Sequence, residues 1–195
     1  SLAFNASNHH YAEIPNASQY AFGQGNFTTA MWVRGDSQPS YSALFIKASN
    51  PSHPYEGITL FLEQNGQGKV TGRTARSAEL ISARADLDSQ QWHHLAMSRQ
   101  GTNLLIYVDG SFDATRVDPL TDVTNAAPIV LGANHVNRNA QNFHGSIDDI
   151  RIYDRALSAA EVAALYQLEN TAHNQAPVFA ESNTTFTTAE NNASA

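Results

Sequence analysis

A polar segment near the end of the chain holds the densest set of side chains able to bind a polar ligand. Few apolar residues interrupt it, and its candidate ligand contacts are Asn134, His135, Asn137, Arg138, Asn139 and Asn142. Amide side chains offer both hydrogen-bond donors and acceptors, which is what sugar hydroxyl groups require, and their oxygens also ligate Ca²⁺. Any single Asn here could be an ordinary solvated residue, but the segment as a whole indicates a binding loop.

A second candidate is a carboxylate at an apolar position. Ile150 and Ile152 alternate with polar residues, which is the spacing of a strand. Asp148 precedes Ile150 by two residues, so a regular strand would place it on the same face as both isoleucines, the expected core face. A buried carboxylate must be paired or coordinated. Asp148 is therefore predicted either to help hold a structural Ca²⁺ or to be satisfied by backbone N–H groups or an Arg.

Short strands must position these candidates. Strands are expected at residues 2–6, 10–14, 26–34, 42–48, 57–63, 68–74, 78–84, 91–99, 103–110 and 128–132, and around Ile150. Helical periodicity appears once, where Ser158 and Glu161 form a capping box. The apolar residues near helical spacing there are Leu157, Val162, Leu165 and Leu168. The predicted fold class is all-β, an antiparallel jelly-roll sandwich with one short C-terminal helix docked against it.

Composition excludes several classes of partner. The formal net charge is -7, which argues against a nucleic-acid or anionic-membrane partner. Acidic side chains and many Asn suit divalent cations and neutral polar ligands better. The chain has no Cys, so it has neither a disulfide framework nor a thiolate metal site. No apolar run approaches the ~18 residues of a membrane span, so direct membrane insertion is not expected.

Five segments together resemble the laminin-G-like, concanavalin A-like family of jelly-roll domains in its bacterial form. They follow the family's order from residue 2 to about residue 168: LAFNASNHHYAEIP, FTTAMWVR, WHHLAMSRQGTNLLIYVDG, IVLGAN and FHGSIDDIRIYDRALSAAEVAALY. The resemblance implies two curved antiparallel sheets, an extracellular location and a role in adhesion or carbohydrate recognition. Many members of the family hold Ca²⁺.

The resemblance also implies neighbours for both candidates. It places the polar loop at a rim of the sandwich, where such folds usually bind ligands, with Asp36, Tyr55 and Glu56 beside it. Tyr55 could stack on a sugar ring, and the two carboxylates could bind hydroxyl groups or an ion. The N-terminal strand is expected to run near the strand of Asp148. The predicted metal ligands are therefore Asn5, Asp148 and backbone carbonyls.

The composition of the chain changes near its end. Residues 1–170 are predicted to form the sandwich, and residues 171–195 to be a linker and the first strand of an incomplete cadherin-like repeat. The tail segments NQAPVF and AENN resemble the start of such a repeat. A laminin-G-like domain followed by such a repeat resembles large bacterial surface adhesins.

The expected function is binding rather than catalysis. Retaining glycosidases need two carboxyl groups about 5–5.5 Å apart, and no Glu-x-Asp-x-x-Glu pattern that would supply them on one strand is present. We expect an extracellular, calcium-dependent carbohydrate-binding adhesion module that is monomeric in isolation. Its expected partners are glycans or glycoproteins on a cell or matrix surface. The alternatives are a protein-binding or spacer module of an adhesin and, less favoured, a glycosidase.

Overall fold

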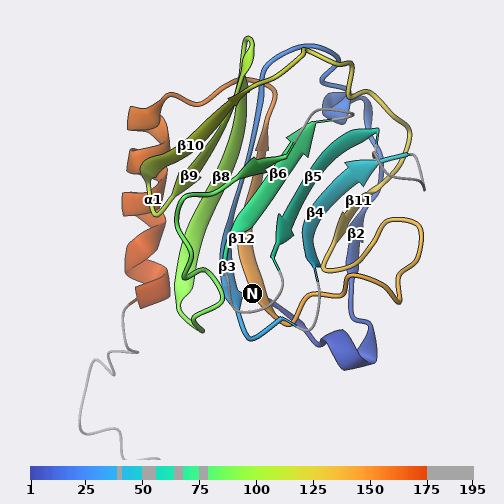
Figure 1. Cartoon of the computed structure of the whole chain (residues 1–195), viewed down its shortest axis with the longest axis vertical. Coiled ribbons are helices and arrows are strands. Elements are labelled where there is room, and N and C mark those ends of the chain that lie inside the picture. Colours follow the sequence, from blue (N-terminus) through green and yellow to red (C-terminus); the bar gives the residue numbers. More distant parts are fainter. Residues whose placement is uncertain (39–40, 50–55, 64–67, 75–78, 175–195) are drawn as a thin grey trace, which may run out of the picture.

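Two antiparallel sheets of six strands each pack face to face in the computed structural model (Figure 1). The structure describes residues 1–38, 41–49, 56–63, 68–74 and 79–174, so Tyr55 and the cadherin-like part of the tail beyond residue 174 lie outside the described residues. The predicted all-β jelly-roll class, with one short helix, is confirmed.

The first sheet has its earliest and its latest strand side by side. Its order is β1 (Leu2–Phe4), β12 (Gly145–Tyr153), β3 (Phe27–Gly35), β8 (Trp92–Gln100), β9 (Asn103–Val108) and β10 (Ser111–Val117). β8 and β9 form the predicted hairpin, in which Gln100 pairs with Asn103. β10 was not predicted, because its sequence SFDATRV forms a largely exposed edge strand without a clear apolar alternation.

The second sheet holds the remaining strands. Its order is β2 (Ala12–Ile14), β11 (Ile129–Leu131), β4 (Ser42–Ala48), β5 (Gly57–Leu62), β6 (Val70–Thr74) and β7 (Leu80–Ile81). Two short 3₁₀ helices, η1 (Ala6–Asn8) and η2 (Ser18–Tyr20), flank β2 along the chain. β1 and β2 are each the outermost strand of their sheet.

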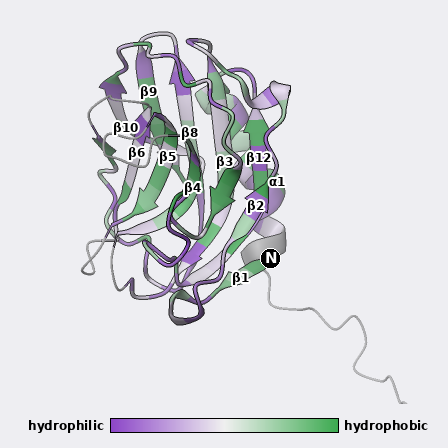
Figure 2. Ribbon diagram, turned by 90° about the vertical axis from the view of Figure 1, so that its right-hand side faces the viewer, coloured by the Kyte–Doolittle hydropathy of each residue, from purple (hydrophilic) through white to green (hydrophobic). Residues whose placement is uncertain are grey.

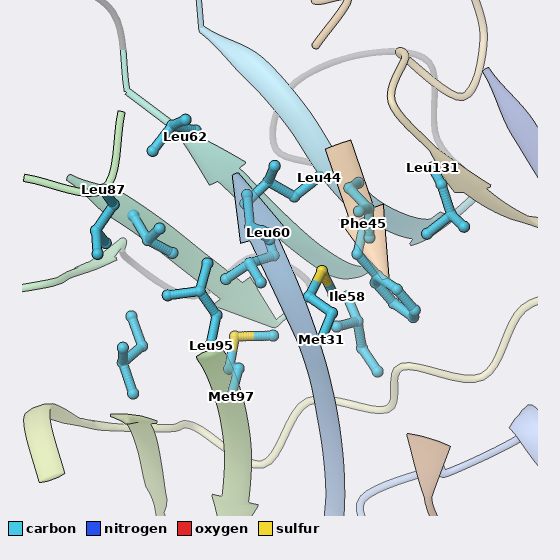
Figure 3. Close-up of a cluster of buried hydrophobic side chains, with 14 of the residues drawn as sticks. Met31, Leu44, Phe45, Ile58, Leu60, Leu62, Leu87, Leu95, Met97 and Leu131 are labelled. Atoms are coloured by element: carbon cyan, nitrogen blue, oxygen red, sulfur yellow. The ribbon is translucent and has the colours of Figure 1, made fainter. Parts of the chain in front are cut away.

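The core lies between the sheets. Met31, Leu95 and Met97 of the first sheet meet a set of aliphatic side chains from the second sheet, among them Leu44, Ile58 and Leu60 (Figure 3). Hydrophobic residues follow the strands through the body of the sandwich, whereas many loops are hydrophilic (Figure 2). Strand alternation therefore predicts the inward-facing residues well.

The helix α1 (Ala159–Asn174) packs on the outer face of the first sheet, beside β8 and β10 (Figure 1). The predicted capping box is present: the backbone N–H of Ser158 donates to the Glu161 carboxylate at 2.8 Å, and the N–H of Glu161 donates to Ser158 Oγ at 3.3 Å. Leu157 and Val162 are buried as predicted, but Leu168 is 73% exposed. The helix also runs four residues beyond the predicted boundary at residue 170.

A polar anchor fixes the far half of α1 to the sheet. Glu169 is buried, and its carboxylate accepts a hydrogen bond from Trp32 Nε1 at 2.9 Å and another from the Arg151 guanidinium. The rings of Trp32 and Tyr166 stack with their centres 5.6 Å apart. The residues that face the sheet from α1 are Val162, Leu165, Tyr166 and Glu169, which follow helical spacing. The expectation for Val162 and Leu165 is confirmed, and the expectation that Leu168 faces the sheet is wrong.

A buried lysine near the end of an interior strand of the second sheet binds the segments that adjoin β2 and β11. Lys47 near the end of β4 donates from Nζ to Asn16 Oδ1 at 2.9 Å, to the carbonyls of Asn125 at 2.9 Å and Ala127 at 2.8 Å, and to Asn125 Oδ1 at 3.1 Å. No carboxylate is among these four acceptors. Burial lowers the pKa of Lys47, since removal from water disfavours the charged ammonium.

Candidate functional site

The predicted binding loop, residues 134–142, joins β11 to β12 and is largely bonded to itself. Asn134 Oδ1 accepts from the backbone N–H groups of Val136 at 2.8 Å and Asn137 at 3.1 Å, and Asn134 Nδ2 donates to Gln141 Oε1 at 2.6 Å. Asn137 Oδ1 accepts from the N–H of Asn139 at 3.1 Å. The amides of Asn134 and Asn137 therefore fix the shape of the loop, whereas the side chain of Asn139 is exposed.

Contacts from the end of the loop tie it to the N-terminal part of the chain. Arg138 donates from Nε to the Glu13 carboxylate at 2.9 Å, and its guanidinium carbon lies 5.4 Å from the centre of the Tyr11 ring. Asn142 is buried, and its Oδ1 lies 2.9 Å from His9 Nδ1. His135 is half-buried within the loop.

A groove of about 390 Å³ lies next to these contacts and is here called the edge groove. It runs between β1 and the segment leading into β2, and it is lined by Leu2, Ala3, Phe4, His9, His10, Tyr11 and Ala12. Tyr11 is 48% exposed, although it is a large aromatic residue. The sequence alone does not assign His9, His10, Tyr11 or Glu13 to the site, because their proximity to the loop depends on β2 pairing with β11.

Asp36 lies beside His144, just past the last residue of the loop. Its carboxylate is 3.8 Å from His144 Nε2, and its backbone N–H donates to the His144 carbonyl at 3.1 Å. A hollow of about 180 Å³ between Asp36 and His144 shares Ala3 and Phe4 with the edge groove. The two depressions therefore flank β1.

Glu56 is not brought to this rim. β4 begins beside the loop, where the N–H of Ala43 donates to the Gln141 carbonyl at 2.8 Å, and it ends where Ala48 pairs with Gly57. Six residue steps along a strand correspond to ~20 Å. Glu56 therefore lies at the opposite end of the sandwich from residues 134–142.

Asp148 does not point into the core, so that premise of the metal prediction is wrong. The pairing of β12 with β3 shifts register between Asp148 and Arg151, and Asp149 has a φ of 44°, which marks a bulge. The extra residue reverses the alternation, so Ile147 is buried while the Asp148 side chain is 32% exposed. Asp148 accepts from the N–H of Asp149 at 3.0 Å and lies 3.3 Å from the amino nitrogen of Ser1.

Asn5 and Asp148 also do not fit a shared metal ion. Asn5 Oδ1 accepts from the N–H groups of Ser7 at 2.9 Å and Asn8 at 3.2 Å and so caps η1. Leu2 pairs with Ile147, which places Asp148 at the start of β1, whereas Asn5 follows its end. Within the described ranges, no three His, Cys, Asp or Glu side chains are grouped so that they could hold a metal ion.

A second depression, here called the strand-face hollow, lies on the outer face of the second sheet. It has a volume of about 60 Å³ and is lined by Tyr41, Thr59, Phe61, Thr71, Arg73, Glu79 and Gln141. The Tyr41 and Phe61 rings lie 5.6 Å apart, and Arg73 forms an ion pair with Glu79. Strand alternation indicates the outward direction of Phe61 and Arg73, but it does not show that Tyr41 lies beside them.

Hydrogen bonds order the phenol of this hollow. The Tyr41 hydroxyl oxygen lies 3.1 Å from Thr71 Oγ1 and 3.3 Å from the Glu63 carboxylate. The Thr71 hydroxyl in turn donates to Glu63 at 2.5 Å. Burial, together with the negative charges of Glu63 and Glu79, raises the pKa of Tyr41. The phenol therefore remains a neutral hydrogen-bonding group at neutral pH.

A two-sheet sandwich with open depressions at one edge and on one strand face has the architecture of a lectin-type domain. The chain belongs to the concanavalin A-like lectin/glucanases superfamily, whose family model matches residues 6–163. A search of curated protein sequences found no match.

Solved structures with the same fold share little sequence with this chain. The binding domain of Paraclostridial Mosquitocidal Protein 1 is 19% identical with a TM-score of 0.66, and the alignment covers 84% of this chain and 42% of that one. Botulinum neurotoxin type C, whose cell entry depends on interaction with two ganglioside molecules, is 13% identical with a TM-score of 0.56 over 74% of this chain and 36% of that one. Domain 4 of the Geobacillus stearothermophilus arabinanase AbnA, in complex with arabinotriose, is 22% identical with a TM-score of 0.59 over 80% and 71%.

These similarities establish the fold, and this chain spans less than half of either toxin chain. In the part of the chain that the structure describes, no helix is long and apolar enough to cross a membrane.

Proposed function

We propose that this domain is an extracellular carbohydrate-binding module that holds a glycan in the edge groove against the 134–142 loop. The observation that carries the proposal is Tyr11, an exposed ring on the groove wall beside the ion pair of Arg138 and Glu13. An aromatic ring can cover the apolar face of a sugar, while the ion pair and Asn139 supply donors and acceptors for its hydroxyl groups.

The loop supports this function mainly through its rigidity. Hydrogen bonds from backbone N–H groups to the Asn side chains of the loop hold Arg138 and Asn139 in one arrangement before a ligand arrives. This order reduces the entropy lost on binding. Each neutral hydrogen bond to a sugar contributes only ~0.5–1.5 kcal/mol net. A single site would therefore bind weakly, and firm attachment would require many copies acting together.

The fold comparisons support the same class of ligand by analogy. One structural neighbour interacts with gangliosides and another is in complex with arabinotriose, although a shared fold does not fix the ligand. The proposed partners are glycans or glycoproteins on a cell or matrix surface, and the proposed role is adhesion as part of a larger surface protein. A protein-binding or spacer role is the alternative that the following experiment separates from it.

Replacing Tyr11→Ala is expected to weaken glycan binding about tenfold, which corresponds to about 1.4 kcal/mol, because the ring face in the edge groove is lost. A glycan array on the parent protein identifies the ligand, and calorimetry measures the change. The matched control is Phe112→Ala, which removes a 55% exposed ring on β10, at the opposite edge of the first sheet from β1. Equal binding by the parent and Tyr11→Ala, or an array without any bound glycan, would refute the proposal and favour the spacer role.

Calcium dependence of glycan binding remains a prediction, and the same calorimetric titration in calcium and in excess chelator measures it. The ligand-free domain is expected to melt at the same temperature in both solutions, because Asn5 and Asp148 lie apart and cannot share an ion. A ligand that binds only the folded state raises the melting temperature by mass action. A clearly higher melting temperature in calcium than in chelator would therefore reveal an ion site formed by other residues.

A second candidate function, glycoside hydrolysis, is favoured by one observation. Glu79 lines the strand-face hollow and Glu63 lies 3.3 Å from the Tyr41 hydroxyl, so two carboxylates lie close to one outward-facing depression. Release of reducing sugar from polysaccharides, abolished by Glu63→Gln, would support hydrolysis. We propose that the hollow binds rather than cleaves, so no release is expected.

A further inference from the structure

The 134–142 loop touches both depressions of the second-sheet side of the molecule. Gln141 lines the strand-face hollow, and the next residue, Asn142, contacts His9 of the edge groove. Arg138, three residues earlier than Gln141, lies against the Tyr11 ring. Residues of both the edge groove and the strand-face hollow therefore contact this loop.

The two depressions also repeat the same set of chemical groups. Each combines an aromatic ring with an ion pair of Arg and Glu: Tyr11 with Arg138 and Glu13 beside the edge groove, and Tyr41 with Arg73 and Glu79 at the strand-face hollow. The sets come from different strands, so local sequence does not cause the repetition. Similar groups at two positions suit a ligand that presents similar groups twice.

Their spacing follows from the strand order of the second sheet. Tyr11 directly precedes β2, Arg73 belongs to β6, and β11, β4 and β5 lie between these strands. Tyr41, on the near wall of the hollow, directly precedes β4, so two to four steps between hydrogen-bonded strands at about 4.8 Å each give a separation of ~10–19 Å. That distance exceeds one sugar ring and is within reach of a short chain of linked sugars.

We propose that the ligand is a linear polysaccharide with a repeating unit, and that one internal stretch of it occupies the edge groove and the strand-face hollow together. This inference rests on the proposed function and specifies its ligand class. The strand-face hollow, at about 60 Å³, is too small to enclose a sugar, but it can receive a single substituent from a chain that lies across the strands. The chain crosses the loop beside Gln141, and linking two weak subsites raises the affinity of long chains over short ones.

The test is calorimetry with two length series, linear arabino-oligosaccharides and sialylated lactosamine chains, each from the shortest member upward. For the series that binds, affinity is expected to rise with length until both subsites are spanned. Tyr41→Phe removes one hydroxyl from the strand-face hollow and is expected to weaken long chains about three- to tenfold while leaving short chains unchanged. Tyr11→Ala is expected to weaken long and short chains alike. Blocking both ends of a long chain with a bulky group should leave its binding intact.

The outcomes separate this inference from the proposed function. Affinity that is already maximal for the shortest binding member, no effect of Tyr41→Phe on long chains, or loss of binding on blocking the ends would overturn the polysaccharide inference. The polysaccharide inference would also be overturned if the array showed binding only to compact terminal sugars and neither length series bound. In that case the edge groove would remain the proposed glycan site. Failure of every glycan on the array would overturn the proposed function itself. Circular dichroism spectra of both variants that match the parent spectrum exclude misfolding as the cause.

Discussion

A chain ending at Ala156 is expected to lose most of its stability, because it lacks α1 and therefore exposes the outer face of the first sheet. That face includes Trp32, which is fully buried in the intact domain. Leu157 and Val162 would be lost from the cluster that covers Ala30 and Ala96 in the strands beneath. Burial of each such aliphatic side chain contributes roughly 1.5–3 kcal/mol, and the Trp32 indole N–H would also lose its acceptor. These losses approach the ~5–15 kcal/mol of net stability of a typical domain.

Thermal and urea unfolding of the shortened chain measure this effect. The control ends at Asn174, which keeps all of α1, and it is expected to unfold like the parent. Glu169→Ala in the full chain should give an intermediate loss of ~1–3 kcal/mol, because Trp32 Nε1 and Arg151 would lose a buried partner. Equal stability of the two shortened chains would show that α1 does not stabilise the sandwich.

Replacing Lys47→Met is expected to cause the second large loss of stability. Four oxygen atoms accept hydrogen bonds from the Lys47 ammonium, and methionine offers them no donor. A buried acceptor left without a partner costs ~1–3 kcal/mol, and more than one acceptor is affected here. Relief of the cost of burying a charge offsets part of this loss. Urea unfolding should therefore show a clear fall in the free energy of unfolding.

The pH dependence of this effect has a definite sign. Burial lowers the pKa of Lys47 below its ordinary value of 10.5, so between these two values the unfolded chain binds more protons than the folded domain. Stability contributed by this group therefore rises with pH within that window and is constant below it. The parent should show this rise relative to Lys47→Met.

Lys69→Met is the matched control for both measurements. Lys69 is the other lysine of the chain and is half-buried before β6. The Lys69→Met substitution changes the net charge by the same amount as Lys47→Met and leaves the four acceptors of Lys47 bonded. A Lys47→Met variant as stable as Lys69→Met would mean that water or a rearranged loop satisfies those acceptors.

The sequence predicted the elements whose signals are local. Alternation of apolar residues indicates the inward faces of β3, β5 and β8, and the Ser158–Glu161 box marks the start of α1. The direction of Asp148 could not be predicted, because the bulge at Asp149 arises from pairing with β3 rather than from local alternation. Glu169 was overlooked for a related reason, since a buried carboxylate is recognisable only once Trp32 and Arg151 lie opposite it.

The sequence indicates the polar loop of the candidate site but not the groups that surround it. The loop of residues 134–142 does lie beside Asp36 and an open groove, yet the amides of Asn134, Asn137 and Asn142 bond within the protein. Asx-type turns use the same side chains that a ligand would, so composition alone does not separate the two uses. Tyr11 comes to the loop only through pairings between strands more than a hundred residues apart in sequence.

The position of β12 between β1 and β3 has a consequence for how the domain folds. β12 is the last strand among the described residues, and it pairs with β1 on one side and with β3 on the other. The first sheet therefore cannot be completed on the ribosome until nearly the whole domain has been synthesised. Until then the edge of β3 and the apolar face beneath it lack their partner. Pairings so distant in sequence slow folding, since a long loop must close before they form. The nascent domain would therefore depend on late closure by β12 to avoid association through its open edge.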